Sequence, residues 1–312
     1  MKVHYYGSFN KSLFKAPVVT VGIFDGVHKG HKQILEILRN KARFTGGESL
    51  VVTLWPHPRV VLYPGKEIKL LNTIEEKITL LEKAGIDHLF VIPFNTEFAK
   101  LTAQQFIKKI LIDEIGMQSL ILGYDNHFGH NKEGDFQVVK EFAGQLHFEI
   151  VHPPAVFEAD VKISSTTIRV FLEMGEVEKA ANFLGYQYSL TGKVVLGRKL
   201  GRSIGFPTAN IEPDNIKMLP RVGVYAVWVY IGNEKYRGMM NIGFRPTIEK
   251  LLLHKTLEVH IINYNSNLYE KEITVTFAYR LRDEIKFSGI DELKSQLDKD
   301  KVNTIQILKN IQ

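Results

Sequence analysis

The chain divides into two stretches whose apolar residues repeat with different periods, and this change limits the folds open to it. Up to about residue 184, short apolar runs such as PVVTVGIF, SLVVTLW and HLFVIPF alternate with segments of helical period, among them residues 32–44 and 74–84. Such alternation is typical of a parallel sheet covered by helices on both faces. We therefore predict a doubly wound α/β domain whose ligands bind at the carboxyl ends of the strands.

After a short helical stretch at residues 165–185, the period falls from about 3.6 to 2. The segments YSLTGKVVLG, GVYAVWVYIG, KYRGMMNIG, KTLEVHIIN and EITVTFAYRL follow one another with no helix expected between them. Consecutive strands with short links predict an antiparallel meander that closes into a small barrel. One helix should end the chain, with Ser288 and Asp291 as its capping box and an apolar stripe interrupted at residues 298–300. We place the boundary near Gly185, which gives domains 1–184 and 185–312.

Composition and charge narrow the class of protein. The length of 312 residues favours two domains, each with its own core. The content of 45% hydrophobic and 24% charged residues is that of a globular protein. No apolar run reaches the length of a membrane helix and the N-terminus lacks a secretory signal, so we expect a cytoplasmic protein with no membrane partner. The absence of cysteine excludes disulfides and thiolate metal sites. A net charge of +6 would favour the binding of nucleic acids or of anionic nucleotides. Because the basic residues are scattered along the chain, we expect no nucleic-acid partner.

The segment GIFDGVHKGHKQIL, residues 22–35, passes from a strand through a glycine-rich turn into a helix. The start of that helix would direct N–H groups and a positive dipole end at an anion such as phosphate. His28 and His31 share one face of its first turn; their N–H groups can donate to phosphate oxygens and, if protonated, offset negative charge. An isolated HxxH pair is more often a solvated surface feature behind a cap such as Asp25, and zinc binding lacks an obvious third ligand.

In this strand–turn–helix setting, the run from Gly22 to His31 resembles the HxGH signature of the nucleotidyltransferase superfamily. Its extended form is similar to that of the bifunctional bacterial riboflavin kinase/FMN adenylyltransferase family. The resemblance implies an N-terminal nucleotidyltransferase domain in which His28 and His31 serve adenylyl transfer from ATP to FMN. A second similar segment is ISSTTIR at residues 163–169. The nucleotide-binding residues implied by the two segments are Gly22, Phe24, Asp25, Gly30, Ser164, Thr166 and Arg169.

Two further segments resemble the adenylylating part of that family, LWPHP at residues 54–58 and GYDNHFGHNKEGD at residues 123–135. They imply that Pro58 and Asp125 bind the flavin. From the residues alone, Asp125 could equally cap a turn, and the hydroxyls at residues 164–166 could form an ordinary helix N-cap.

The same region departs from the family pattern, which usually reads Gly-x-Asp-Phe-x-Phe-Gly with an arginine a few places on. Here Asn126 replaces the first aromatic residue and Lys132 replaces the arginine. An asparagine cannot stack as an aromatic ring does, and a lysine cannot form a bidentate phosphate contact. We therefore expect slower adenylylation or a different mode of flavin binding.

A second glycine-rich segment, GRKLGRSIGFPTANIEP at residues 197–213, does not match the Walker pattern and by itself is typical of a turn in a barrel. The run from Gly201 to Asn210 is nevertheless similar to the riboflavin kinase signature of the same family. The resemblance implies that Thr208 and Asn210 hold a nucleotide-bound Mg²⁺, a cation that prefers oxygen ligands. It also implies nucleotide binding by Gly201, Gly205 and Pro207.

Glu258, in TLEVHIIN, matches the catalytic glutamate of the family. Riboflavin presents a neutral alcohol, so its phosphorylation calls for a base near the hydroxyl. On an alternating strand, Glu258 could point into a site or into water. The segments NIGFRPT and LRDEIKF also resemble family segments and imply flavin contacts by Arg245 and Arg282. Glu270 stands where the family usually has glycine, which predicts an altered turn.

These motifs, in the family's order from about residue 18 to residue 300, predict an enzyme of flavin cofactor synthesis. Riboflavin would be phosphorylated by ATP to FMN, and FMN would be adenylylated by a second ATP to give FAD and pyrophosphate. The expected partners are therefore riboflavin, FMN and ATP, with Mg²⁺ as cofactor. Two alternatives stay open: a nucleotidyltransferase for another phosphorylated acceptor, which leaves the GFPTAN segment unexplained, and a flavin- or RNA-binding module without turnover. No oligomeric state is predicted.

Overall fold

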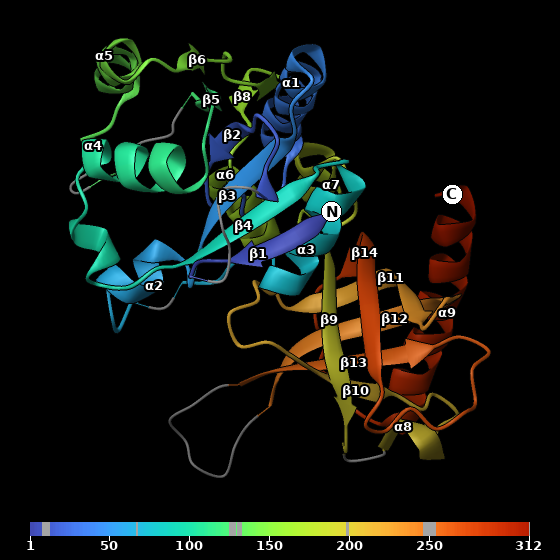
Figure 1. The fold of residues 1–312 in the computed structure, drawn as a ribbon. Helices are drawn as coiled ribbons and strands as arrows, with labels where there is room; N and C mark the ends of the chain where they lie inside the picture. Colours follow the sequence, from blue (N-terminus) through green and yellow to red (C-terminus); the bar gives the residue numbers. More distant parts are fainter. Residues whose placement is uncertain are drawn as a thin grey trace. The chain divides into compact units, whose positions relative to one another are not determined.

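The chain forms two compact units, Met1–Ser165 and Thr166–Gln312, in a computed structural model (Figure 1). The structure describes residues 1–7, 13–66, 68–124, 129, 133–197, 200–245 and 254–311. Within these residues, no helix is long and apolar enough to cross a membrane. The division between the units precedes Gly185, because the helices of residues 165–184 pack with the second unit; a functional boundary near Gly185 stays a prediction.

The first unit is built on a parallel sheet of six strands in the order β1-β4-β3-β2-β5-β6. The strands are β1 (Lys2–Tyr5), β2 (Val18–Val21), β3 (Ser49–Trp55), β4 (His88–Pro93), β5 (Ser119–Ile121) and β6 (Glu149–Val151). Every neighbouring pair is parallel. The chain proceeds from β2 to one side of the sheet and later returns to its other side with β5, so the strand order reverses next to β2. Ligands of open α/β sheets bind at the carboxyl ends of strands at such a reversal.

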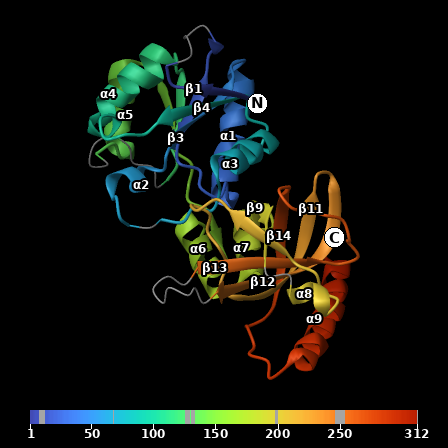
Figure 2. The same cartoon turned by 90° about the horizontal axis from the view of Figure 1, so that it is seen from below.

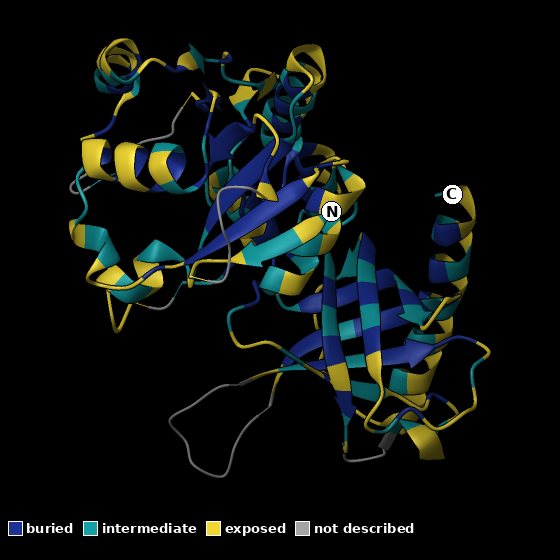
Figure 3. Cartoon of the chain, viewed as in Figure 1, coloured by how far each residue is buried: buried dark blue, intermediate teal, exposed yellow. Residues whose placement is uncertain are grey.

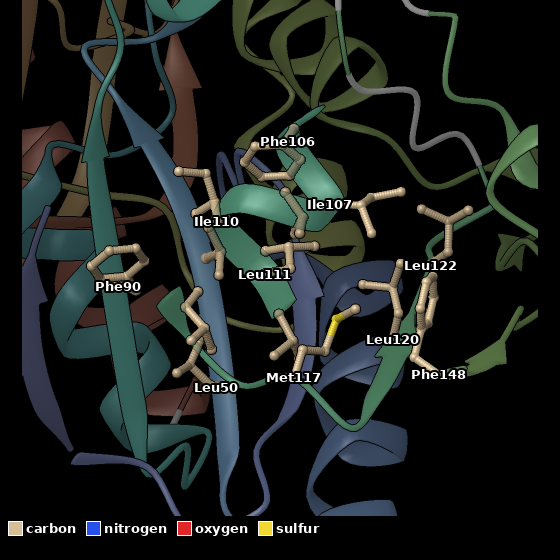
Figure 4. Packing of buried hydrophobic residues seen from close by; sticks show 14 of the residues in the cluster. Leu50, Phe90, Phe106, Ile107, Ile110, Leu111, Met117, Leu120, Leu122 and Phe148 are labelled. Carbon is tan, nitrogen blue, oxygen red and sulfur yellow. The ribbon is translucent and has the colours of Figure 1, made fainter. Parts of the chain in front are cut away.

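Helices cover both faces of this sheet, as predicted for a doubly wound domain. On one face, Val18 and Val51 pack in a cluster with Leu35 of α1 (Lys29–Thr45) and Leu81 of α3 (Ile74–Lys83). Residues adjacent to these in the strands, among them Val19, Leu50 and Phe90, face the other side. There they meet the π-helix η3 (Phe106–Glu114), which continues the short α4 (Ala103–Gln105), and α5 (Phe136–Leu146); Figure 4 shows this packing.

The first unit also contains short elements outside these layers. They are α2 (Pro58–Leu62), the 3₁₀ turn η2 (Phe98–Lys100), and a hairpin of β7 (Phe157–Glu158) and β8 (Val161–Lys162). The central strands are buried along their length while the outer surfaces of the helices are exposed (Figure 3). All four residues of β2 are buried, which fixes the start of the loop that follows it.

The second unit contains a closed antiparallel barrel in the order β10-β13-β12-β11-β14-β9 (Figure 2). Its elements are α6 (Ser165–Met174), α7 (Val177–Leu184), β9 (Ser189–Val195), α8 (Leu200–Ser203), β10 (Ala209–Pro213), β11 (Gly223–Ile231), β12 (Glu234–Arg245), β13 (His254–Ile261), β14 (Glu272–Arg282) and α9 (Ile290–Asn310). The predicted barrel is confirmed, but the plain meander is wrong. Strands β9 and β10 pair, as do β11, β12 and β13 in turn, but β10 is not beside β11 and β13 is not beside β14: β10 lies between β9 and β13, and β14 lies between β11 and β9.

The terminal helix α9 packs on the barrel through Leu308, which clusters with Ala226 of β11 and Ala278 of β14. The expected capping box of Ser288 and Asp291 is wrong. The backbone N–H and the hydroxyl of Ser288 both donate to Glu292 Oε2, at 2.8 and 2.7 Å, and Gly289 is the residue before the helix. The helix also continues through residues 298–300 without a break.

Candidate active sites

The loop after β2 lies where the strand order reverses, and its conformation is strained. Phe24 and Val27 adopt positive φ angles of 51° and 34°, although neither is glycine, and both side chains are buried. Such angles persist only where the surroundings enforce them, and they cluster at functional sites. Asp25 provides part of that enforcement, because its Oδ1 accepts from the N–H groups of Leu71 at 2.9 Å and Asn72 at 3.2 Å.

His28, and not Asp25, caps the helix α1. The backbone of His28 is extended, and its Nδ1 accepts the N–H of His31 at 3.2 Å. Gly30 permits this arrangement, because a Cβ at that position would lie 3.2 Å from the same Nδ1. The first turn of α1 contains Lys29 but no acidic residue. A helix N-terminus favours negative charge, so this end of α1 is suited to an anionic ligand.

The two imidazoles form a stacked pair, with ring centroids 3.6 Å apart and planes 13° apart. Burial lowers the pKa of His28 to about 4. The pKa of His31 lies well below its ordinary value, first through burial and then through the charges of His28 and Lys77. Both rings are therefore uncharged near neutral pH. Of the two ways in which they could assist a phosphate, donation from N–H fits this site and charge neutralisation does not.

The other residues predicted for this site are distributed over several segments. Ser165, one of the hydroxyl residues expected at the helix start, donates from Oγ to the backbone oxygen of Asp25 at 2.8 Å. Thr166 and Arg169 follow in the first turns of α6. Pro58 is the first residue of α2, directly after the end of β3. Asp125, Asn126 and Lys132 lie outside the described residues.

In the barrel, the glycine-rich segment between β9 and β10 is anchored at two places. The N–H of Phe206 donates to the oxygen of Gly201 at 2.8 Å, and a Cβ on Gly201 would lie only 2.1 Å from the oxygen of Phe206. The ring of His260 on β13 lies 2.8 Å through Nδ1 from the oxygen of Pro207 and makes an edge contact with Phe206. Gly205, with a φ of 85°, makes the turn between these anchors.

These anchors bring together the residues predicted for the kinase. Asn210 on β10 and Glu258 on β13 are direct partners in the strand register, and Asn241 on β12 is the partner of Glu258 on its other side. The hydroxyl of Thr208 donates to Glu258 Oε2 at 3.5 Å. Glu258 is half-buried, whereas its neighbours Leu257 and Val259 are buried, so the strand alternates as expected.

The residues predicted to hold Mg²⁺ fit such an ion. The hydroxyl of Thr208 and the amide of Asn210 each provide an oxygen atom, and both residues lie next to Glu258; oxygen is the ligand that Mg²⁺ prefers. Within the described part of the chain, no group of three or more histidine, aspartate or glutamate side chains could hold a metal by itself. Water or nucleotide phosphates would have to supply the other ligands, as is usual for Mg²⁺.

Of the two arginines predicted to contact flavin, the structure describes the side chain of Arg282 and not that of Arg245. Arg282 forms a bidentate ion pair with Asp300 of α9, in which Nη2 lies 2.7 Å from Oδ2 and Nε lies 3.1 Å from Oδ1. The side chain of Asp300 is 3% exposed, so this pair joins the terminal helix to the barrel in a buried position. The side chain of Arg245 lies outside the described residues.

Comparison with known proteins assigns a family to each unit. The family model for FAD synthetase matches residues 11–167, and that for riboflavin kinase matches residues 184–308. A crystal structure named as a macrolide-efflux protein from Streptococcus pneumoniae has a TM-score of 0.88 and 30% identity, and the match covers 97% of this chain and 99% of that one.

Curated relatives match almost end to end. The bifunctional riboflavin kinase/FMN adenylyltransferase of Bacillus subtilis is 37% identical over 94% of this chain and 93% of its own length. The enzyme of the same name from Escherichia coli is 36% identical over 91% of this chain and 90% of its own. Because family models match both parts of the chain and these relatives cover more than 90% of it, the protein belongs to the bifunctional riboflavin kinase/FMN adenylyltransferase family.

Proposed function

We propose that the two steps of FAD synthesis are carried by the two sites described above. As a member of its family, the chain phosphorylates riboflavin to FMN and then adenylylates FMN to FAD, with ATP as donor in both steps. The barrel site of Thr208, Asn210 and Glu258 carries the first step. The site of His28 and His31 at the start of α1 carries the second.

In the kinase step, the primary hydroxyl of riboflavin attacks the γ-phosphorus of ATP. Glu258 accepts the proton of that hydroxyl as the new oxygen–phosphorus bond forms, and ADP leaves with the electrons of the bond that breaks. The hydroxyl of Thr208 donates to Glu258 and keeps its carboxylate directed toward the site. Thr208 and Asn210 would also hold Mg²⁺, which supplies positive charge to the transferring phosphate.

In the adenylylation step, an oxygen of the FMN phosphate attacks the α-phosphorus of ATP, and pyrophosphate leaves. No base is required, since the attacking phosphate is already ionised near neutral pH. His28 and His31 donate N–H groups to the oxygens on which negative charge grows, and the dipole of α1 adds to this stabilisation. Thr166 and Arg169 on α6 bind the phosphates of ATP in this proposal. Asp25 holds the turn in place through its contacts with Leu71 and Asn72.

The observation that carries the proposal is the meeting of Thr208, directly before β10, with Asn210 on β10 and Glu258 on the neighbouring β13. The direct experiment is to incubate the purified protein with ATP and Mg²⁺ and either riboflavin or FMN, and to separate FMN and FAD by chromatography. We expect FMN and then FAD from riboflavin, and FAD from FMN alone. A preparation that forms neither product while retaining its fold would contradict the proposal, and omission of Mg²⁺ should stop the kinase step.

A further inference from the structure

The row of polar residues at the kinase site extends one strand beyond Glu258. Asn210 on β10, Glu258 on β13 and Asn241 on β12 are successive partners in the strand register. Partners of this kind direct their side chains to one face of the sheet, with Cβ atoms about 4.5–5.5 Å apart. Asn241 is half-buried, whereas Met240 and Ile242, which precede and follow it, are buried. Asn241 therefore flanks the proposed base on the side opposite to Asn210.

The side chain of Asn241 is held by a residue from a distant part of the barrel. Its Nδ2 donates to Oε1 of Glu284, in the loop after β14, at 3.1 Å. Gly243, two residues along β12 on the same face, makes room for this contact. A Cβ on Gly243 would lie 2.2 Å from Glu284 Oε1 and 3.0 Å from Asn241 Nδ2. Because Nδ2 donates to Glu284, Oδ1 of Asn241 is the atom that can accept from the hydroxyl of a ligand.

The loop that carries Glu284, residues 283–289, is anchored on both sides of it. Before Glu284, the carboxylate of Asp283 accepts from Arg280 Nη2 at 2.6 Å. After it, the N–H of Ser288 donates to Glu292 of α9 at 2.8 Å. The two adjacent carboxylates of the loop thus have different partners, an arginine for Asp283 and a neutral amide for Glu284. Glu284 is placed to orient an amide at the kinase site.

The chemistry of the kinase step indicates which substrate lies over Asn241. The attacking and leaving oxygens of a transferring phosphoryl group lie roughly in line, so the alcohol and the nucleotide approach from opposite sides. In the proposed site, Asn210 lies on the nucleotide side of Glu258, and Asn241 lies on the other. The acceptor, riboflavin, presents a chain of hydroxyl groups next to the one that reacts. Hydroxyls donate and accept hydrogen bonds, so an amide and a carboxylate suit them.

We propose that Asn241, held in place by Glu284, binds the inner hydroxyl groups of the riboflavin side chain and so fixes the reacting hydroxyl beside Glu258. Asn241 is then a specificity-determining residue for the acceptor, and Glu284 is the positioning residue that acts through it. This inference rests on the proposed function, because it takes Glu258 as the base of the kinase and Asn210 as a residue of the nucleotide side.

The first test compares two acceptors for the kinase. One is riboflavin, and the other is a flavin whose side chain is an unbranched alkyl alcohol of the same length, with the terminal hydroxyl alone. The wild type should prefer riboflavin by about tenfold or more in kcat/KM, because a site built to bind hydroxyls rejects an analogue that lacks them. Asn241→Leu keeps the size of the side chain and removes its amide.

In Asn241→Leu, the preference for riboflavin should fall by about tenfold, through a higher KM for riboflavin. The kcat/KM for the analogue, the KM for ATP and the adenylylation of FMN should stay within about twofold of the wild type. An unchanged preference, or an equal loss of activity toward both acceptors, would overturn the inference.

The second test asks whether Glu284 acts through Asn241. Glu284→Ala should reproduce the loss of preference, whereas Glu284→Gln retains an oxygen that can accept from Nδ2 and should keep most of it. The double variant Asn241→Leu with Glu284→Ala should be no worse than Asn241→Leu alone; additive losses would contradict the positioning role. Glu272→Ala, an exposed carboxylate at the other end of β14, is the matched control and should change neither activity.

Gly243→Ala tests the close approach of the two strands. Its methyl group would meet the end of the Glu284 side chain, which can turn away, so we expect the thermal midpoint to be maintained and Glu284 to be displaced. The preference for riboflavin should fall as in Glu284→Ala, with no further loss when the two substitutions are combined. A Gly243→Ala protein with the full preference would contradict the inference.

A purely structural role for the pair of Asn241 and Glu284 predicts a different pattern, in which Asn241→Leu lowers the thermal midpoint and affects both acceptors equally. Glu258→Gln distinguishes the inference from the function on which it rests. Full kinase activity in Glu258→Gln would contradict the proposed base, whereas the comparison of the two acceptors would still decide whether Asn241 binds the hydroxyls of riboflavin.

Discussion

Thr208, in the loop before β10, donates a hydrogen bond of 3.5 Å to Glu258 of β13, while Asn210 of β10 stands beside Glu258 in the strand register. Glu258, the proposed base of the kinase, thus contacts one of the two predicted metal ligands directly and is the strand partner of the other.

Replacing Glu258 by glutamine should remove the base and keep the shape of the site. We expect riboflavin phosphorylation to fall by about 10²- to 10⁴-fold, the usual contribution of a general base, while FMN adenylylation is unchanged. Steady-state assays of the two half-reactions measure this directly. Equal loss of both activities would point to misfolding, and full kinase activity would show that another group accepts the proton.

The burial of His28 should make the first unit sensitive to acid. Its pKa in the folded state is about 4, below the ordinary value of 6.5, so the unfolded chain binds the proton more readily. The free energy of unfolding should therefore decrease as the pH falls from about 6.5 to 4, by about 3 kcal/mol from this residue. Urea titrations at pH 7 and pH 5 test this; His28→Asn keeps a capping side chain and should reduce the difference.

The contact between Gly201 and Phe206 predicts a selective effect on the kinase. A methyl group on Gly201 would lie 2.1 Å from a backbone oxygen, so Gly201→Ala must displace the loop that leads to Thr208. We expect riboflavin phosphorylation to fall by about tenfold or more while adenylylation is maintained, because a misplacement of about 1 Å in a catalytic group is costly.

Gly144→Ala is the matched control for this substitution. Gly144 lies within α5, and a Cβ there meets no atom within 4 Å. This variant should retain both activities and gain about 0.5–1 kcal/mol in the free energy of unfolding, since alanine is the better helix former. A kinase defect in Gly144→Ala equal to that of Gly201→Ala would refute the steric explanation.

The ion pair of Arg282 and Asp300 predicts a structural role for Arg282, and its predicted contact with the flavin can be tested separately. Asp300→Asn should lower the free energy of unfolding by about 3 kcal/mol, because it leaves a partly buried guanidinium without its counter-ion. The double variant Arg282→Met with Asp300→Leu should recover most of this loss. If its KM for riboflavin stays within about twofold of the wild type, Arg282 does not bind the flavin; a large increase would support the original interpretation.

The architecture was largely predictable from the sequence because burial sets the period of the apolar residues. The strands at residues 49–55 and 88–93 and the helix at residues 74–83 occur where the pattern predicted them. β10 was not predicted, because its five residues lie in a glycine-rich segment that was interpreted as a turn and a nucleotide-binding motif. Without β10, the strand order could not be derived, and a meander was the simplest closure.

The residues of the sites were found by motif, but their interactions depend on contacts between distant segments. Asp25 looked like a helix cap because it precedes α1, whereas its carboxylate bonds to residues 71 and 72. Asp300 was predicted only to interrupt the apolar stripe of the terminal helix. The sequence of that helix does not reveal its partner, Arg282, because Arg282 belongs to a strand. Glu270 has a positive φ of 65°, a conformation that favours glycine, and the altered turn expected at this position stays a prediction.

The position of β14 between β11 and β9 bears on how the protein matures during translation. All six strands of the sheet have been synthesised once residue 151 is added, whereas the last strand of the barrel is complete only at residue 282. Because domains tend to fold in the order of their synthesis, the framework for the second reaction is assembled before the framework for the first. A nascent chain would thus be ready to consume FMN before it can produce any.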